Sequence, residues 1–144
     1  MDIETITAAQ ARPLRHAVLR PYGNHEDNAY PGDDDPDALH IGLFHSAVLV
    51  ATASVLHQAP PGAIDVGAWR LRGVAVHESY RNHGRGAELI AIAIAYVNEA
   101  GGTTLWGNAR REARNFYERE GFHVEGELAD DPVSGGHYFM VLKL

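Results

Sequence analysis

The sequence predicts a mixed α/β fold, of the α+β kind, as one domain over residues 1–144. Apolar residues alternate with a period of two in some segments and recur at three- and four-residue intervals in others, which separates strands from helices. A long helical segment lies between two strand segments in mid-chain, so a right-handed crossover should place those strands side by side and parallel. With 144 residues, 45% of them hydrophobic, the chain is long enough for a full core.

The first helix is expected near residues 8–20. Thr7 is followed three residues later by Gln10, which is a capping-box pattern, and apolar residues then recur at helical spacing. Residues 21–39 contain prolines, glycines and a run of aspartates, so they should form a long surface loop. Loops of this length are often functional.

The remaining elements follow from the same two periods and from turn residues. Segments 40–44 and 47–56 should form a hairpin, and segment 69–76 alternates as a largely buried strand does. Apolar spacing then predicts a helix near 86–100 that ends before two glycines. The last expected elements are a strand at 103–108, a helix near 109–120 with Gly121 in its C′ position, and strands at 122–127 and 137–144.

Composition excludes several kinds of chemistry. The chain has no cysteine, which excludes a thiol nucleophile and any metal site with thiolate ligands. Twelve Lys and Arg against 19 Asp and Glu give a net charge of −7, which disfavours a nucleic-acid surface and mildly favours cationic small partners. The histidines lack the short paired spacing of zinc sites, and the acidic run 33–37 lacks the glycine and glutamate of a calcium loop, so no metal is expected.

Nothing near Met1 has the composition of an export signal, and no apolar stretch approaches the roughly 20 residues of a membrane span. A cytoplasmic protein with no membrane role is therefore expected. The oligomeric state is left open, with a homodimer among the candidates.

The most informative segment joins the strand 69–76 to the following helix, and its core is Arg81-x-x-Gly84-x-Gly86. Glycines there allow a tight turn and close approach of a ligand, and the first N–H groups of the helix point outward at the positive end of its dipole. Such a turn suits phosphate or pyrophosphate. A loop that uses glycine only to turn is the alternative. The spacings of the Walker and G-x-G-x-x-G motifs are absent, which disfavours a nucleotide triphosphatase.

A second motif lies downstream, where Ala113, Phe116, Tyr117, Gly121 and Phe122 give the pattern A-x-x-F-Y-x-x-x-G-F. Together the two motifs resemble the Gcn5-related N-acetyltransferase (GNAT) family, and the resemblance extends in element order over essentially the whole chain. It implies a GNAT-like mixed sheet, flanked by helices, whose parallel central strands 69–76 and 103–108 splay apart and admit acetyl-CoA as cosubstrate.

The resemblance also implies how the coenzyme is held. The turn from Arg81 to Ala87 would bind the pyrophosphate, Val74–Val76 would pair with the pantetheine arm, and the Val76 N–H would polarise the thioester carbonyl. Asn108 would contact the pantetheine from the end of its strand. The implied cofactor-binding residues are Val74, Ala75, Val76, Arg81, Asn82, His83, Gly84, Arg85, Gly86, Ala87, Asn108, Ala113 and Phe116.

The catalytic residues expected are Tyr117 and His40. Tyr117 matches the family's tyrosine that faces the coenzyme sulfur, where a phenol can protonate the departing thiolate; a tyrosine that only packs its helix is the alternative. Many relatives carry a glutamate on the strand before the turn, but residues 69–72 include no carboxylate. His40, just after the acidic run, is then the candidate general base, with His137, His77 or water as alternatives. The acidic run itself is read as a solvated loop or an attractor for a cationic substrate.

The expected function is acetyl-CoA-dependent N-acetylation of a primary amine on a small molecule. Direct transfer in a ternary complex is expected, because no cysteine is available to carry the acetyl group. Three alternatives stay open: an acyltransferase that uses a longer acyl-CoA, a non-catalytic CoA-binding module, and a phosphate-binding domain unrelated to the family. The acceptor is not identified, because the loops 21–39, 57–68 and 128–136 carry no motif.

Overall fold

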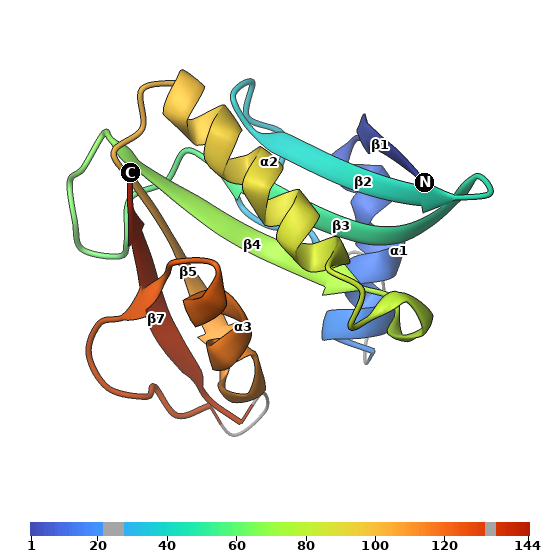
Figure 1. The fold of residues 1–144 in the computed structure, drawn as a ribbon. Coiled ribbons are helices and arrows are strands. Elements are labelled where there is room, and N and C mark those ends of the chain that lie inside the picture. The colour runs from blue at the N-terminus through green and yellow to red at the C-terminus, as the bar shows by residue number, and fades with distance from the viewer. Residues whose placement is uncertain (22–27, 132–134) are drawn as a thin grey trace.

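A computed structural model of the chain describes residues 1–21, 28–131 and 135–144. The strands are β1 (Asp2–Thr5), β2 (Leu39–His45), β3 (Val48–Leu56), β4 (Ala68–Val76), β5 (Thr104–Arg110), β6 (His123–Val124) and β7 (His137–Lys143). The α-helices are α1 (Ala8–Leu19), α2 (Arg85–Glu99) and α3 (Arg114–Arg119), and the short 3₁₀ helices are η2 (Glu78–Tyr80) and η3 (Arg111–Ala113). The strands form one mixed sheet in the order β1-β2-β3-β4-β5-β7-β6 (Figure 1).

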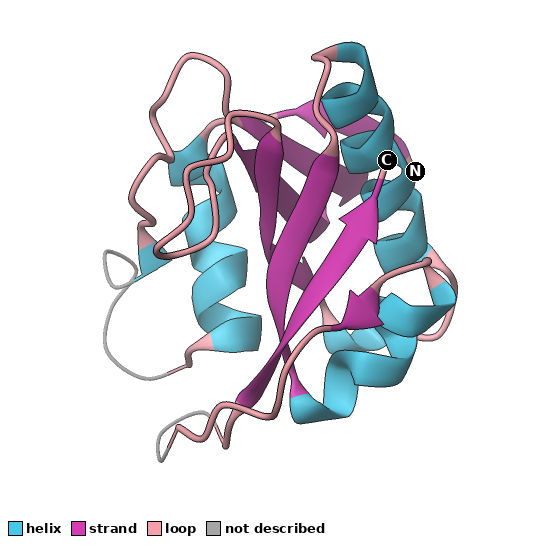
Figure 2. Ribbon diagram, turned by 90° about the vertical axis from the view of Figure 1, so that its left-hand side faces the viewer, coloured by secondary structure: helices cyan, strands magenta, loops and turns pink. Residues whose placement is uncertain are grey.

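Helices cover both faces of this sheet. Figure 2 shows α1 on one face and the longer α2, together with α3, on the other. The capping box predicted for α1 is present: the Gln10 N–H donates to Thr7 Oγ1 at 3.1 Å, and the Thr7 N–H donates to Gln10 Oε1 at 2.8 Å. The predicted mixed α/β architecture is therefore confirmed.

The main core lies between α2 and the sheet. Leu89, Ile90, Ala93 and Val97, the apolar stripe of the helix, are fully buried against the central strands. Full burial of a large aliphatic side chain stabilises a fold by about 1.5–3 kcal/mol, so this stripe fixes α2 on β3 and β4. The position of α2 in turn sets where the turn that precedes it lies.

The two central strands run parallel, as predicted, but pair only where 68–70 face 104–106. Beyond Arg70 they diverge, and Figure 1 shows the wedge that opens between β4 and β5. A bulge contributes to the divergence. The register between β3 and β4 shifts near Gly73, whose φ of 64° is in the left-handed region that favours glycine. A bulged strand bends, so the end of β4 turns away from β5.

Several boundaries differ from the sequence prediction. Strand β1 was not predicted, because its four residues are all exposed and give no apolar alternation. The helix expected at 109–120 begins at 111 as a 3₁₀ turn, since β5 continues to Arg110. The strand expected at 122–127 is only two residues long. The predicted end of α3 is confirmed: the N–H groups of Gly121 and Phe122 donate to the carbonyls of Glu118 and Tyr117.

Candidate active site

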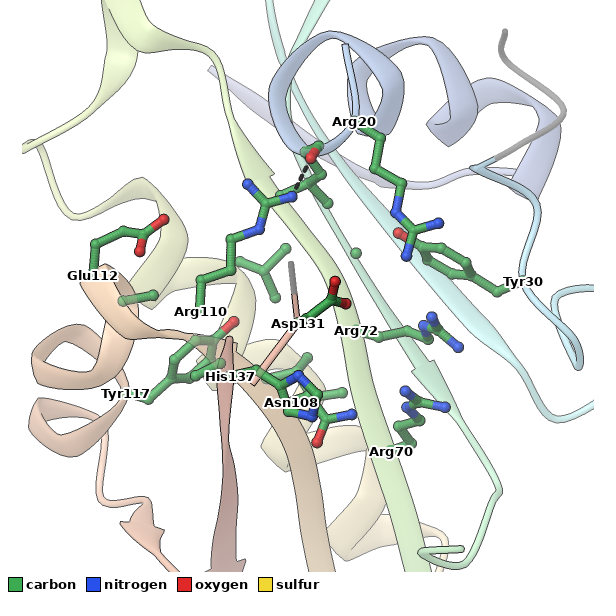
Figure 3. A pocket seen from close by; sticks show the side chains of 16 residues that line it. Arg20, Tyr30, Arg70, Arg72, Asn108, Arg110, Glu112, Tyr117, Asp131 and His137 are labelled. Atoms are coloured by element: carbon green, nitrogen blue, oxygen red, sulfur yellow. Dashed lines mark hydrogen bonds between the residues drawn. The ribbon is translucent and has the colours of Figure 1, made fainter. Parts of the chain in front are cut away.

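A cavity of about 550 Å³ opens where β4 and β5 diverge (Figure 3). Its walls come from both strands, from the end of α1 with Tyr30, and from η3 and α3. Four of the residues implied by the family motifs line it: Val74, Asn108, Ala113 and Tyr117.

The point at which the strands part is set by Gly107. A Cβ at this position would lie 2.7 Å from the carbonyl oxygen of Leu71, a distance at which the strand backbone would have to move. A residue without a side chain therefore lets β4 and β5 touch here, at the closed end of the wedge.

The N–H and the carbonyl of Val76, the last residue of β4, face the wedge. The His77 N–H donates to the Val50 carbonyl at 2.8 Å, so the backbone N–H of His77 points toward β3. Peptide groups alternate sides along a strand, so those of Val76 point the other way, toward the side from which β5 has diverged. The Val76 carbonyl accepts a bond from Arg81 Nε at 3.0 Å, which agrees with this direction.

The glycine turn lies between the end of β4 and the start of α2. Gly84 has a φ of 75° and immediately precedes the helix, and a Cβ there would meet no atom within 4 Å. The turn thus presents an open surface beside the positive end of the α2 dipole. None of the residues 81–87 lines the 550 Å³ cavity.

The other implied cofactor residues are spread around this turn. Phe116 packs against Gly86, Ala75 is buried in β4, and Arg85 Nη1 forms an ion pair with Glu88 at 2.7 Å. Asn82, with a φ of 65°, shapes the turn together with Gly84.

Tyr117 reaches the cavity from α3, and Figure 3 shows its hydroxyl directed into it. Its ring makes edge contacts with Phe116 and Phe122, with centroids 5.2 and 5.6 Å apart. Among the residues that the structure describes, none forms a hydrogen bond with the hydroxyl. Burial raises the pKa of Tyr117, so the phenol keeps its proton at neutral pH.

His40 does not reach the cavity, which counts against its predicted role as general base. It is 5% exposed, on β2 beneath α1, and both ring nitrogens have partners. Nδ1 lies 2.7 Å from Ser54 Oγ, and Nε2 lies 2.8 Å from the Asp33 carbonyl oxygen. A base must reach the proton that it removes. This buried imidazole, hydrogen-bonded at both nitrogens, is better placed to hold the loop that contains Asp33 than to contact a substrate.

The acidic run is only partly the solvated loop that was expected. Asp34 and Asp35 are exposed, but Asp33 is 5% exposed and binds Arg15 through both carboxylate oxygens, at 2.8 and 3.1 Å. Burial by itself would raise the pKa of Asp33, but the bonds from Arg15 and from the Tyr30 N–H outweigh it and leave the pKa lowered. Asp33 therefore anchors the loop and offers no free charge to a substrate.

The most prominent feature of the cavity, its arginines, was not predicted as part of the site. Arg70 and Arg72 of β4 point into it, as do Arg20 and Arg110 (Figure 3). The alternation of residues 69–76 already placed Arg70 and Arg72 on one face of the strand. His137, an alternative base in the sequence analysis, also lines the cavity, whereas His77 caps η2 by accepting the Ser79 N–H.

Within the described ranges, no three His, Asp or Glu side chains are grouped so as to hold a metal ion. None of the helices described is both long enough and apolar enough to cross a membrane.

Comparison with known proteins agrees with the motifs and the geometry. The family model described as "Acetyltransferase (GNAT) family" matches residues 4–122. The uncharacterized N-acetyltransferase YitI of Bacillus subtilis (strain 168) is 33% identical over 144 residues, which cover 100% of this chain and 97% of that protein.

Solved structures share the fold. An aminoglycoside 6′-N-acetyltransferase complexed with coenzyme A superposes with a TM-score of 0.79 at 16% identity, over 99% of this chain and 97% of the other. An acyl-CoA N-acyltransferase from Pseudomonas aeruginosa gives a TM-score of 0.76 at 20% identity, over 98% of each chain. The chain therefore belongs to the acetyltransferase (GNAT) family and is an N-acetyltransferase, as its two motifs predicted.

Proposed function

We propose that residues 1–144 form one N-acetyltransferase domain that transfers the acetyl group of acetyl-CoA directly to a primary amine of a small molecule in a ternary complex. The observation that carries this proposal is the cavity at the diverging strands, with the Tyr117 hydroxyl directed into it and the glycine turn at the end of β4. Acetyl-CoA would supply the acetyl group, activated as a thioester.

The turn and β4 fit the coenzyme. N–H groups from Arg81 to Ala87 would bind the pyrophosphate beside the helix dipole, and the open space at Gly84 leaves room for it. Val74 to Val76 would pair with the pantetheine arm along the side from which β5 has parted, with Asn108 on the facing strand. The bonds to the pyrophosphate would be charge-assisted, and each bond of that kind contributes about 1.5–3 kcal/mol.

The Val76 N–H would donate to the thioester carbonyl oxygen as that oxygen gains negative charge. A fixed backbone dipole in a cleft that excludes water stabilises such charge without having to reorient during the reaction. The direction of the Val76 peptide group, away from β3, supports this role.

Tyr117 would hold the proton that the departing thiolate requires. Its raised pKa keeps the phenol protonated, and burial also disfavours the thiolate, so both groups become more basic in the same cavity. The proton lost by the acceptor amine would pass to His137 or to water. His137 is the histidine that lines the cavity among the described residues, so we prefer it to His40.

Two alternatives from the sequence are less well supported. A non-catalytic CoA-binding module does not agree with the N-acetyltransferase assignment, and it would need neither the cavity nor a phenol directed into it. A longer acyl-CoA would need space for its chain beside Tyr117. Release of free thiol from acetyl-CoA with a panel of amines, and from butyryl-CoA in parallel, separates them. We expect amine-dependent release that is faster with acetyl-CoA, and release with neither thioester would contradict the proposal.

A further inference from the structure

We propose that the acceptor amine carries an anionic group, a carboxylate or a phosphate, which Arg70 and Arg72 bind. The inference rests on the proposed function, since it concerns the acceptor side of the same cavity. It replaces the expectation of a substrate drawn in only by its positive charge.

The two arginines share one face of β4, because residues 70 and 72 are separated by a single position of the strand. Their guanidinium groups lie side by side in the cavity, on the wall across from Tyr117 (Figure 3). An acceptor whose anionic end lies on these groups would extend its amine toward Tyr117 and the end of β4.

Aromatic rings support both guanidinium groups. Arg72 Cζ lies 3.8 Å from the centroid of the Tyr30 ring, and Arg70 Cζ lies 4.7 Å from that of the Trp106 ring. Trp106 is itself buried and donates its indole N–H to the Gln58 carbonyl at 2.8 Å. Arginines that are stacked in this way are already ordered, so binding an anion costs little further side-chain entropy.

Neither arginine has an anionic partner among the residues described. Neither forms an ion pair with a carboxylate, and the Arg70 Nε is buried without a hydrogen-bond acceptor. The buried Arg15 differs in having a counter-charge: its Nε also lacks an acceptor, but Asp33, Ser54 and the Asn28 carbonyl accept the bonds of its two Nη groups. An unpartnered buried donor is costly, and a bound anion would supply the acceptor that Arg70 Nε lacks and the counter-charge that both guanidinium groups lack.

The charges around the cavity point the same way. Arg20 and Arg110 also line it, and the carboxylates on its wall are those of Glu112 and Asp131. The cavity therefore has an excess of guanidinium groups, although the chain as a whole has a net charge of −7. Burial, and then the neighbouring charge of Arg70, lowers the pKa of Arg72 to about 10, as expected for cations held together in a partly desolvated space.

Matched pairs of amines test the inference. Glycine, β-alanine and 4-aminobutyrate are compared with methylamine, ethylamine and n-propylamine, and phosphoethanolamine with ethanolamine, by thiol release from acetyl-CoA. At least one anionic member should exceed its neutral partner in kcat/KM by about tenfold or more, the size expected for a charge-assisted bond. The two anion series also show whether a carboxylate or a phosphate is preferred.

Variants then assign the preference to residues. Arg70→Gln and Arg72→Gln should raise the KM of the anionic acceptor about tenfold or more and leave the KM of acetyl-CoA unchanged. Arg119→Gln, which removes an exposed arginine of α3 outside the cavity, is the matched control and should retain the preference. Arg72→Lys keeps the charge without the planar fork, and it replaces Arg72→Gln if that variant fails to fold.

Two outcomes overturn the inference while the proposed function stands. The first is an equal kcat/KM for the neutral amines and their anionic partners. The second is that the variants of Arg70 and Arg72 raise the KM of acetyl-CoA and not that of the acceptor. If none of the amines in the panel caused thiol release, that result would instead count against the proposed function. In that case saturation-transfer NMR with 4-aminobutyrate and n-propylamine tests the inference by binding alone. The inference fails unless the parent binds 4-aminobutyrate more tightly than n-propylamine and Arg70→Gln weakens that binding.

Discussion

The ring of Phe116 lies against Gly86, so that a Cβ on Gly86 would sit 2.9 Å from the Cζ atom of Phe116. The two sequence motifs are therefore in direct contact, because the ring of Phe116 from α3 packs on the second glycine of the first motif. A substitution at Gly86 would disturb this packing as well as any coenzyme site. Gly84, with no atom within 4 Å of its missing Cβ, tests the coenzyme site more cleanly.

Gly84→Asp and Gly84→Asn form a matched pair. Both side chains tolerate the left-handed backbone conformation better than other residues do, and they have nearly the same shape. The aspartate adds a negative charge where we place the pyrophosphate, so it should weaken binding of coenzyme A about tenfold or more relative to the asparagine, most strongly at low salt. Calorimetric titration measures this, with thermal melts to show equal folding. Equal affinity of the two variants would place the pyrophosphate elsewhere.

Replacement of Tyr117 by Phe keeps the ring contacts and removes the proton donor. Because general acid catalysis is typically worth about 10²–10⁴ in rate, kcat should fall by that order while the KM of acetyl-CoA changes little. Burial raises the pKa of Tyr117, so the parent should show no loss of activity from this group as the pH rises to 10. A variant that retains the parent kcat, with chemistry shown to limit the rate, would leave Tyr117 only a packing role.

His137 and His40 are distinguished by the pH profile. His137→Gln should lower kcat and remove the acidic limb of the profile, if the imidazole accepts the proton of the amine. His40→Gln should instead lower the melting temperature, because its ring bonds Ser54 and the Asp33 carbonyl in the interior. Loss of the acidic limb in His40→Gln, with folding intact, would restore His40 as the base.

Asp33→Asn should destabilise the fold by about 3–5 kcal/mol at neutral pH, because it leaves the buried Arg15 without its counter-charge. The pKa of Asp33 is lowered in the folded state from its usual 3.8, so its contribution is complete above that pH and is lost as the pH falls through the lower, folded value. Urea unfolding between pH 7 and pH 2 should show the difference between parent and variant shrinking below about pH 4. A difference that stays constant over this range would contradict the assignment.

Much of the fold could be predicted from the sequence because its signals are local. The capping box at Thr7, the apolar stripe of α2 and the glycine that ends α3 each depend on a few neighbouring residues. Strand β1 gave no such signal, since it is held by backbone pairing with β2 and buries no apolar face.

The candidate site was predictable only where motifs carried it. The glycine turn and Tyr117 were found, but the partners of His40 and Asp33 come from α1 and β3, far along the chain, and no local pattern reveals them. The pair of arginines in the cavity could have been predicted, since alternation on β4 places Arg70 and Arg72 on one face. What the sequence could not show is that the facing strand would diverge and leave that face open.

Transfer of the acetyl group itself can be followed with an isotope label. Acetyl-CoA labelled with ¹³C at the acetyl carbonyl is incubated with the protein and the best amine of the panel, and the label is followed by NMR. We expect the label to move from the thioester to an amide of that amine, and Tyr117→Phe to slow this transfer. Label that stays on the thioester or appears as free acetate, whichever amine is present, would contradict the proposed function.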